Sequence, residues 1–223
     1  LKEGNSYKPL GRHNVDFGGG LERQGMISQQ KESYYETDIY MPILEAVQKI
    51  SKEGTLRSER IVVDHLKAAT WIIMDGIAPG RTEQGYILRR LIRRAIRHGR
   101  MLGVEEPFTR EISSVAIDQF KDVYEGLGKN KTDILDTIEE EELRFRKTLQ
   151  SGLKKFEELL SEKGSLSGED AFHLYETYGY PVEITREMLG EHGLKLDMAE
   201  DDKAYKKHQE QSRPAAAGLF KGG

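Results

Sequence analysis

The chain has 223 residues, of which 37% are hydrophobic and 32% charged, and its formal net charge is −4. The mean hydropathy is −0.65 and no apolar run approaches about 18 residues, so the sequence predicts no membrane-spanning helix. The absence of cysteine excludes disulfides, thiolate nucleophiles and cysteine-based zinc sites. The polar start contains no signal or transit peptide, so we expect a cytoplasmic protein with no membrane partner. Because residue 1 is Leu, we also expect a piece of a longer protein.

The N-terminal part predicts little regular structure. Residues 1–20 are expected to form turns and short strands, with residues 14–17 as the best strand. A helix is expected from Leu21 onward. The next helix is predicted to use Thr37 as its N-cap, which would place Pro42 close to where helices tolerate proline.

From residue 36 on, amphipathic periodicity predicts an all-α body. Ser58 is expected to cap its first long helix, and Ser167 a later one with Asp170 completing a capping box. The predicted fold class is therefore mainly α with a short N-terminal β segment. Further helices are expected near residues 86–102, 109–124, 132–163, 182–193 and 200–212.

The longest predicted helix, at 132–163, carries an apolar stripe that includes Phe145 and Leu153. The stripe is interrupted by acidic residues at Glu141 and Glu142, which the helical period places near the buried face.

Charge is unevenly distributed along this body. Residues 55–103 hold ten Lys and Arg against four Asp and Glu, whereas residues 104–170 hold ten against seventeen. A local patch matters more than the total when the partner is a polyanion, so the basic segment is a candidate nucleic-acid interface.

The predicted helix at 86–102 supplies most of this basic charge. At about 100° per residue, its apolar side chains gather on one face around Leu88 and Ile92, and its arginines on the opposite face. We expect the apolar face to be buried and the basic face to be free, with phosphates as the natural counter-charge. The six arginines are Arg89, Arg90, Arg93, Arg94, Arg97 and Arg100.

Two other interpretations of this face remain open. The acidic helix at 132–163 would neutralise it, since charge runs are commonly paired. An anionic membrane is less favoured, because the apolar face lacks Trp and Phe and the helix lies in mid-chain.

Three consecutive glycines, at residues 18–20, precede the first predicted helix. Glycines remove Cβ atoms, so a ligand can lie against the main chain near a helix N-terminus. Asp16 suits an ammonium-bearing ligand, and Arg23 suits a phosphate or a base. The spacing matches neither common nucleotide-binding glycine motif, so a plain turn is the alternative. The histidines form no H-x-x-x-H pair, and no metal site is predicted.

Several stretches together resemble one known family. VDFGGGLERQGMI resembles motif 3 of the class II aminoacyl-tRNA synthetases, in the form that is similar to the alanyl-tRNA synthetases. The terminal HQEQSRPAAAGLFKGG resembles the join before that family's editing domain. Further signatures follow in the family's order: YYETDIYMPIL, DHLKAATWIIMDGIAPG, GYILRRLIRRAIRHGRMLG, EEELRFRKTLQSGL and AFHLYETYGYPVEIT.

The resemblance implies an enzyme that activates alanine with ATP and Mg²⁺ and transfers it to the 3′ end of tRNA(Ala). Asp16 would bind the alanine ammonium group, and Gly18 and Gly20 would form the floor of the adenylate site. Arg23 would act on ATP as the catalytic residue. Motifs 1 and 2 and the editing domain are not among these residues. We therefore expect the chain alone to be inactive, to hold no cofactor stably, and to need the N-terminal catalytic portion and the editing domain as partners.

The same resemblance implies a domain organisation. Residues 1–53 would end the catalytic domain and its antiparallel sheet, residues 54–212 would form a helical tRNA-recognition domain, and residues 213–223 would lead toward the editing domain. The helical domain would bind the tRNA(Ala) acceptor stem through Arg89, Arg90, Arg93, Arg94 and Arg97.

The family reads a G·U pair in the acceptor stem with an Asn and an Asp. This chain has Arg81 and Glu176 at those positions, so the geometry of the reading is expected to differ. Two other functions stay open: a non-catalytic tRNA-binding module derived from a synthetase, and a helical scaffold in which the 132–163 helix docks another helix.

Overall fold

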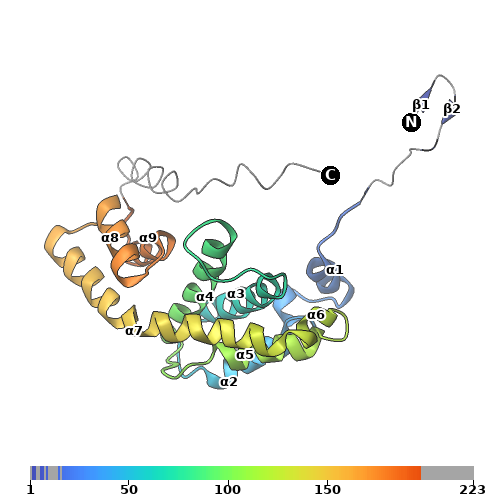
Figure 1. The fold of residues 1–223 in the computed structure, drawn as a ribbon, viewed down its shortest axis with the longest axis horizontal. Coiled ribbons are helices and arrows are strands. Elements are labelled where there is room, and N and C mark those ends of the chain that lie inside the picture. Colours follow the sequence, from blue (N-terminus) through green and yellow to red (C-terminus); the bar gives the residue numbers. More distant parts are fainter. Residues whose placement is uncertain (1, 4–5, 8, 10–14, 16, 197–223) are drawn as a thin grey trace. The chain divides into compact units, whose positions relative to one another are not determined.

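The structure is a computed structural model that describes residues 2–3, 6–7, 9, 15 and 17–196 (Figure 1). The chain divides into two compact units, Leu1–Met41 and Pro42–Gly223. Within the described ranges, no helix has the length and apolar character needed to cross a bilayer. The helix predicted at 200–212 lies outside the described residues.

In its described residues, the first unit contains two short strands and one α-helix. β1 (Lys2–Glu3) pairs antiparallel with β2 (Ser6–Tyr7), and α1 (Leu21–Ser28) begins directly after the three glycines, as predicted. The expected strand at 14–17 is not found at Val15 and Phe17, which belong to no strand. Asn14 and Asp16 lie outside the described residues.

Thr37 supplies the backbone part of the predicted N-cap, since its carbonyl oxygen accepts from the Met41 N–H at 2.8 Å, but its hydroxyl is used elsewhere. Its hydroxyl donates to the carbonyl oxygen of Tyr34 at 2.6 Å and so closes the 3-10 turn η1 (Tyr34–Glu36). Helix α2 (Met41–Ile50) begins four residues later, with Pro42 at its second position, where the missing N–H costs nothing. The prediction was right about Pro42, and for Thr37 it holds for the backbone but not for the side chain.

The second unit is built from helices, and this confirms the mainly α prediction for the described residues. The helix predicted at 109–124 ends early, at Phe120, because a turn separates it from a further short helix. Beyond α2, the helices are α3 (Leu56–Met74), α4 (Glu83–Met101), α5 (Thr109–Phe120), α6 (Glu125–Lys129), α7 (Lys131–Lys163), α8 (Gly168–Tyr178) and α9 (Val182–Glu191).

Helix α4 lies at the centre of this unit. It packs lengthwise on α3, and α7 contacts both of them (Figure 1). Its predicted apolar face is buried, with Leu88, Ile92 and Ala95 fully inaccessible. Burying such side chains contributes roughly 1.5–3 kcal/mol each, so this face anchors the unit.

The cap of α3 differs from the prediction. Thr55 is the N-cap, and its hydroxyl accepts from the Ser58 backbone N–H at 3.3 Å. Ser58 is buried inside the first turn, where its hydroxyl lies 3.1 Å from Nδ1 of His98 on α4. In contrast, the capping box predicted for Ser167 and Asp170 at the start of α8 is confirmed.

The acidic interruption in the α7 stripe has a structural cause. Glu142 is fully buried and accepts hydrogen bonds from the Phe108 N–H and from the Thr109 N–H and hydroxyl, which satisfies the start of α5. Arg146 donates to the same carboxylate from one turn along α7, at 2.7 Å. Glu142 thus acts as a remote cap for α5 and not as a surface charge.

The predicted stripe is wrong at Leu153, which is 40% exposed. Gly152 takes the buried position beside it, because the Tyr180 ring packs against the α7 backbone and a Cβ at Gly152 would clash with that ring. The Tyr180 hydroxyl donates to the Leu149 carbonyl oxygen at 2.6 Å, which fixes the ring against α7.

Candidate functional site

The basic face of α4 is paired with carboxylates from two other helices. Its arginines meet Glu141 of α7 and three glutamates of α9, and most are buried or half-buried. The shortest N–O distances are Arg89–Glu141 3.4 Å, Arg90–Glu183 2.6 Å, Arg93–Glu141 2.6 Å, Arg94–Glu187 2.8 Å and Arg97–Glu191 2.5 Å.

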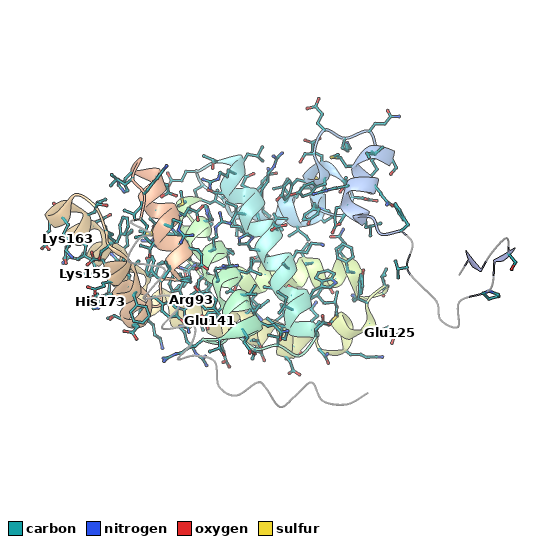
Figure 2. The ribbon with its side chains drawn as sticks, turned by 90° about the horizontal axis from the view of Figure 1, so that it is seen from above. Arg93, Glu125, Glu141, Lys155, Lys163 and His173 are labelled. Atoms are coloured by element: carbon teal, nitrogen blue, oxygen red, sulfur yellow. The ribbon has the colours of Figure 1, made fainter. Side chains whose placement is uncertain are left out.

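Arg93 is the most deeply buried of these arginines, with 4% of its surface exposed, and Glu141 is equally buried. The two lie side by side in the interior of the unit (Figure 2). Arg93 also donates to the Gly179 carbonyl oxygen at the end of α8, and its guanidinium lies 4.8 Å from the centre of the Phe145 ring. This one side chain therefore joins α4, α7 and α8.

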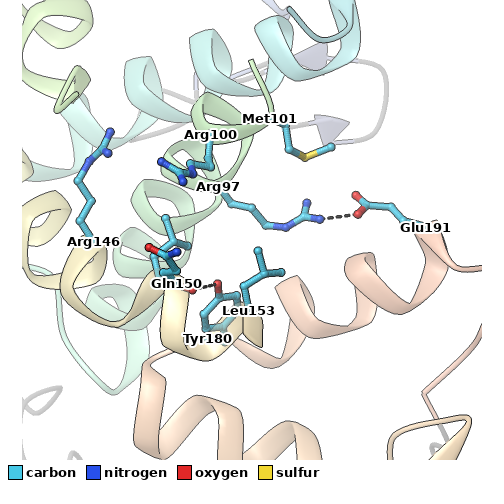
Figure 3. Close-up of a pocket in the computed structure, with 9 residues that line it drawn as sticks. Arg97, Arg100, Met101, Arg146, Gln150, Leu153, Tyr180 and Glu191 are labelled. Atoms are coloured by element: carbon cyan, nitrogen blue, oxygen red, sulfur yellow. Dashed lines mark hydrogen bonds and ion pairs between the residues drawn. The ribbon is translucent and has the colours of Figure 1, made fainter. Parts of the chain in front are cut away.

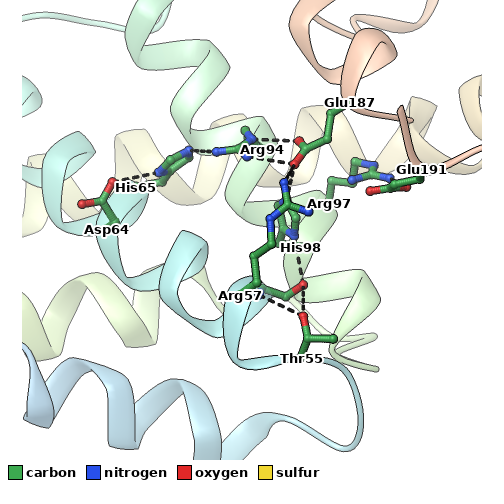
Figure 4. Close-up of polar contacts among 10 residues, drawn as sticks. Thr55, Arg57, Asp64, His65, Arg94, Arg97, His98, Glu187 and Glu191 are labelled. Atoms are coloured by element: carbon green, nitrogen blue, oxygen red, sulfur yellow. Dashed lines mark hydrogen bonds and ion pairs between the residues drawn. The ribbon is translucent and has the colours of Figure 1, made fainter. Parts of the chain in front are cut away.

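Three further pairs form an ion-pair ladder between α4 and α9: Arg90–Glu183, Arg94–Glu187 and Arg97–Glu191. The three glutamates are spaced four residues apart along α9, and the three arginines are spaced four and then three residues apart along α4. These spacings place the glutamates on one face of α9 and the arginines on one face of α4. Figure 4 shows Arg94 and Arg97 reaching Glu187 and Glu191 from the neighbouring helix.

Glu187 is the hub of this ladder. Arg94 binds it bidentately through Nε and Nη2 at 2.8 Å, Arg57 donates at 3.0 Å, and Nε2 of His98 lies at 3.3 Å. Burial acts to raise the pKa of Glu187, but the hydrogen bonds from His98 and Arg94 outweigh it and hold the pKa well below its usual range. Burial also lowers the pKa of His98, which favours the neutral ring.

A second chain of contacts extends from Arg94 to α3. Its Nη1 lies 2.7 Å from Nε2 of His65, whose Nδ1 lies 3.2 Å from the Asp64 carboxylate (Figure 4). An arginine can only donate, so His65 accepts at Nε2 and donates to Asp64 from Nδ1. Asp64 and His65 thereby hold the Arg94 guanidinium in place for Glu187.

The expectation of a free basic face on α4 was therefore wrong. The alternative, neutralisation by the acidic 132–163 helix, is right for Arg89 and Arg93. The other ion-paired arginines meet glutamates of α9, a helix that the sequence did not lead us to expect as a partner. A sequence signal existed, since Glu183, Glu187 and Glu191 follow a helical repeat that matches the arginine spacing on α4.

A solvent-filled cleft of about 560 Å³ lies beside the ladder, between α3, α4 and α9. It retains an excess of positive charge, because four arginines face it against two glutamates. Arg57 at its rim has a side chain that is 66% exposed. The charged side chains lining it are Arg57, His65, Arg90, Arg94, Glu183, Arg186 and Glu187.

The structure places the loop that carries Arg81 next to α8. The loop closes on itself, with the Gly80 N–H donating to the Gly85 carbonyl oxygen at 2.9 Å. A Cβ at Gly85 would lie 2.8 Å from the Ala78 carbonyl oxygen, so only glycine permits this closure. Both Arg81 and Glu176 are exposed.

Two tyrosines join the start of α4, just after this loop, to α8. The Tyr86 ring, just after the loop, meets the Tyr175 ring edge-on at 5.9 Å, and its hydroxyl donates to Glu183 at 2.8 Å. Burial raises the pKa of Tyr175, and the positive charges of Arg89 and Arg81 oppose that rise. Arg81 therefore lies near enough to Tyr175 for its charge to act on that hydroxyl.

The predicted adenylate-site residues are described only in part. Gly18, Gly20 and Arg23 are placed at the start of α1, whereas Asp16 lies outside the described residues. Gly20 is the N-cap of α1 with a φ of −75°, and among the described residues a Cβ there would meet only the Arg23 side chain, at 3.8 Å. In the described part of the chain, no three acidic or histidine side chains gather as metal ligands.

Comparison with known proteins identifies the family. The model of the class II (A) tRNA synthetases matches residues 2–221, and the chain belongs to this family. The relatives it matches include alanine–tRNA ligases. That of Thermotoga maritima is 38% identical over 93% of this chain and 25% of its own length, and that of Elusimicrobium minutum is 42% identical over 96% and 26%. That of Dehalococcoides mccartyi is 43% identical over 83% of this chain and 22% of its own length. The chain thus spans about a quarter of these relatives.

Proposed function

We propose that the chain is the part of an alanine–tRNA ligase that completes the adenylate site and binds the acceptor stem of tRNA(Ala). The observation that supports this most strongly is the family match over nearly the whole chain, together with relatives named alanine–tRNA ligase. The enzyme would use ATP and alanine, with Mg²⁺ on the ATP phosphates. It would act in the cytoplasm, with a catalytic portion and an editing domain supplied by other parts of the protein.

The proposed division of labour keeps the boundaries predicted from the sequence. Residues 1–53 would end the catalytic domain and its antiparallel sheet, residues 54–212 would recognise tRNA, and residues 213–223 would link to the editing domain. Gly18, Gly20 and Arg23 would contact the adenylate at the start of α1, where backbone N–H groups favour phosphate. Asp16 would bind the alanine ammonium group. We assign no Mg²⁺ ligand to this chain.

The tRNA-binding role is divided among the arginines according to their burial. Arg93 and Arg97 are buried and paired, so they would act by holding α8 and α9 in place. Arg81 and Glu176 would contact the base pair, and Arg90 and Arg94 would attract phosphates toward the basic cleft. Arg89, partly exposed beside Glu141, would add positive charge near Tyr175 that attracts the RNA backbone.

A chimaera tests the proposal. Replacing the matching segment of the Thermotoga maritima alanine–tRNA ligase with this chain should preserve both ATP–pyrophosphate exchange and alanylation of tRNA(Ala). Loss of alanylation with exchange intact would instead favour a mismatch in tRNA recognition. A chimaera that folds and binds tRNA but lacks both activities would favour the alternative of a non-catalytic tRNA-binding module.

A further inference from the structure

A pocket of about 380 Å³ opens between the end of α4, the middle of α7 and α9 (Figure 3). Its volume is in the range typical of small-molecule sites. It lies apart from the predicted RNA contacts at Arg81 and Glu176, which do not line it. The lining residues are Arg97, Arg100, Met101, Arg146, Leu149, Gln150, Leu153, Tyr180 and Glu191.

One part of the pocket is apolar and accessible. Met101 and Leu153, from two different helices, are each 40% exposed and belong to the few exposed large hydrophobic residues of the described chain. Leu149 adds to this surface, and the Tyr180 ring is fixed beside it by the hydrogen bond to the Leu149 carbonyl oxygen. Exposed apolar side chains that converge in a concavity are typical of a ligand site.

The other part of the pocket carries unmatched positive charge. The Arg97 side chain is nine-tenths buried and uses Nη2 to bind Glu191 at 2.5 Å. Its Nη1 is also buried and has no hydrogen-bond partner among the described residues. A buried guanidinium donor without a partner costs free energy unless a ligand satisfies it.

Two more arginines surround the same space. Arg100 is exposed at the end of α4, and no ion pair is recorded for it within the described residues. Arg146 also lines the pocket, but it is ion-paired with Glu142 and donates to the Glu105 and Glu106 carbonyl oxygens, so three of its five N–H groups are already engaged. Apart from Arg146, which Glu142 neutralises, two arginines therefore face one carboxylate, Glu191.

We propose that this pocket binds a nucleoside monophosphate, with the phosphate on Arg97 and Arg100 and the base on Met101, Leu149 and Leu153. Arginine forks match phosphate oxygens, and the exposed Gln150 amide offers both a donor and an acceptor to the edge of a base. The proposal goes beyond alanylation and does not depend on it.

Titration with adenosine 5′-monophosphate tests the proposal on the 223-residue chain. With ¹³C-methyl-labelled methionines, binding should shift the Met101 methyl signal, which a Met101→Leu variant would assign. Met26 in α1 serves as an internal control, because binding at the glycine segment would move its signal instead. Saturation without a change at Met101, or no saturation at millimolar concentration, would overturn the proposal.

Variants separate the two halves of the site. Arg100→Gln should weaken the affinity about tenfold, the effect of losing one charge-assisted hydrogen bond. Arg144→Gln, an exposed arginine of α7 outside the pocket, should not change it. Adenosine and inorganic phosphate should each bind more weakly than the nucleotide. Equal binding of phosphate alone, or an unchanged affinity of Arg100→Gln, would refute the nucleotide assignment.

Discussion

At the scale of single residues, burial decides what an arginine of α4 does. Arg93 and Glu141 form a desolvated pair in the interior, whereas Arg144 and Glu140 form an exposed pair on the solvent side of α7. Glu140 and Glu141 are sequence neighbours with opposite environments. Helical projection placed the arginines on one face correctly, but it could not tell which of them would meet a partner.

The buried pair leads to the first prediction. Glu141→Gln should lower the free energy of unfolding by about 3 kcal/mol, because it leaves the Arg93 charge buried without a counter-charge. Urea denaturation followed by circular dichroism measures this. Glu140→Gln is the matched control and should be nearly neutral, since exposed pairs contribute little. Equal effects of the two variants would show that burial is not the cause.

Charge reversal at Arg93 should likewise unfold the protein, contrary to the expectation of a free basic face.

Gly20 gives a second prediction at this scale. In an alanine–tRNA ligase that contains this chain, Gly20→Val should abolish ATP–pyrophosphate exchange, because the added side chain would occupy the adenylate floor. Among the described residues a Cβ would meet only the Arg23 side chain and φ is −75°, so a steric clash within the fold does not explain such a loss. Because valine is also a poor N-cap, circular dichroism of the variant should show that α1 is retained. Gly20→Ala should lose less activity. Normal exchange by the valine variant would remove Gly20 from the adenylate site.

At the scale of helices, the ladder between α4 and α9 is sensitive to acid. The folded-state pKa of Glu187 lies below its usual 4.5, so its stabilisation is complete above that pH and is lost as the pH falls. The folded-state pKa of His98 lies below 6.5, so below that pH the unfolded chain takes up a proton that the folded chain resists. Both effects weaken the folded state on acidification.

Glu187→Gln isolates the carboxylate contribution. At pH 7 the variant should be less stable than the parent by about 2 kcal/mol, the value of a hydrogen bond to charged groups at a mostly buried site. This difference should shrink below pH 4.5. There the carboxyl group is protonated in the unfolded parent chain, and keeping it ionised in the folded state costs free energy. Urea unfolding across pH measures it, with the exposed Glu162→Gln as control. A difference that stays constant down to pH 3 would contradict the assignment of Glu187 as hub.

Local sequence determined most of the helices but not their partners. The start of α1, the extent of α7 and the capping box at Ser167 follow from short-range periodicity and side-chain chemistry. Ser58 was assigned the cap that Thr55 holds, because neighbouring Thr and Ser residues compete for the same role. The Thr37 hydroxyl was assigned to a helix start but binds the Tyr34 carbonyl oxygen. The exposure of Leu153 and the burial of Glu142 depend on Tyr180 and on α5, which are distant in sequence.

At the scale of the whole chain, the arginine-rich helix is the structural centre of the second unit. Most of its arginines form ion pairs with glutamates of α7 and α9. The side chains of Arg81, in the loop before α4, and of Glu176, on α8, are exposed and accessible to a ligand. The resemblance found the family from motifs alone, and the family match over residues 2–221 confirms it. The departures at Arg81 and Glu176 make recognition of the acceptor stem the central question.

The affinity of an acceptor-stem minihelix of tRNA(Ala) for the chain, its Arg81→Gln variant and its Arg144→Gln variant tests this account most directly. Arg81→Gln should weaken binding about tenfold or more, as expected for loss of one base or phosphate contact. Arg144→Gln, exposed on α7, should bind as the parent does. An Arg81→Gln variant with unchanged affinity at low salt would contradict the claim that RNA recognition lies at this loop.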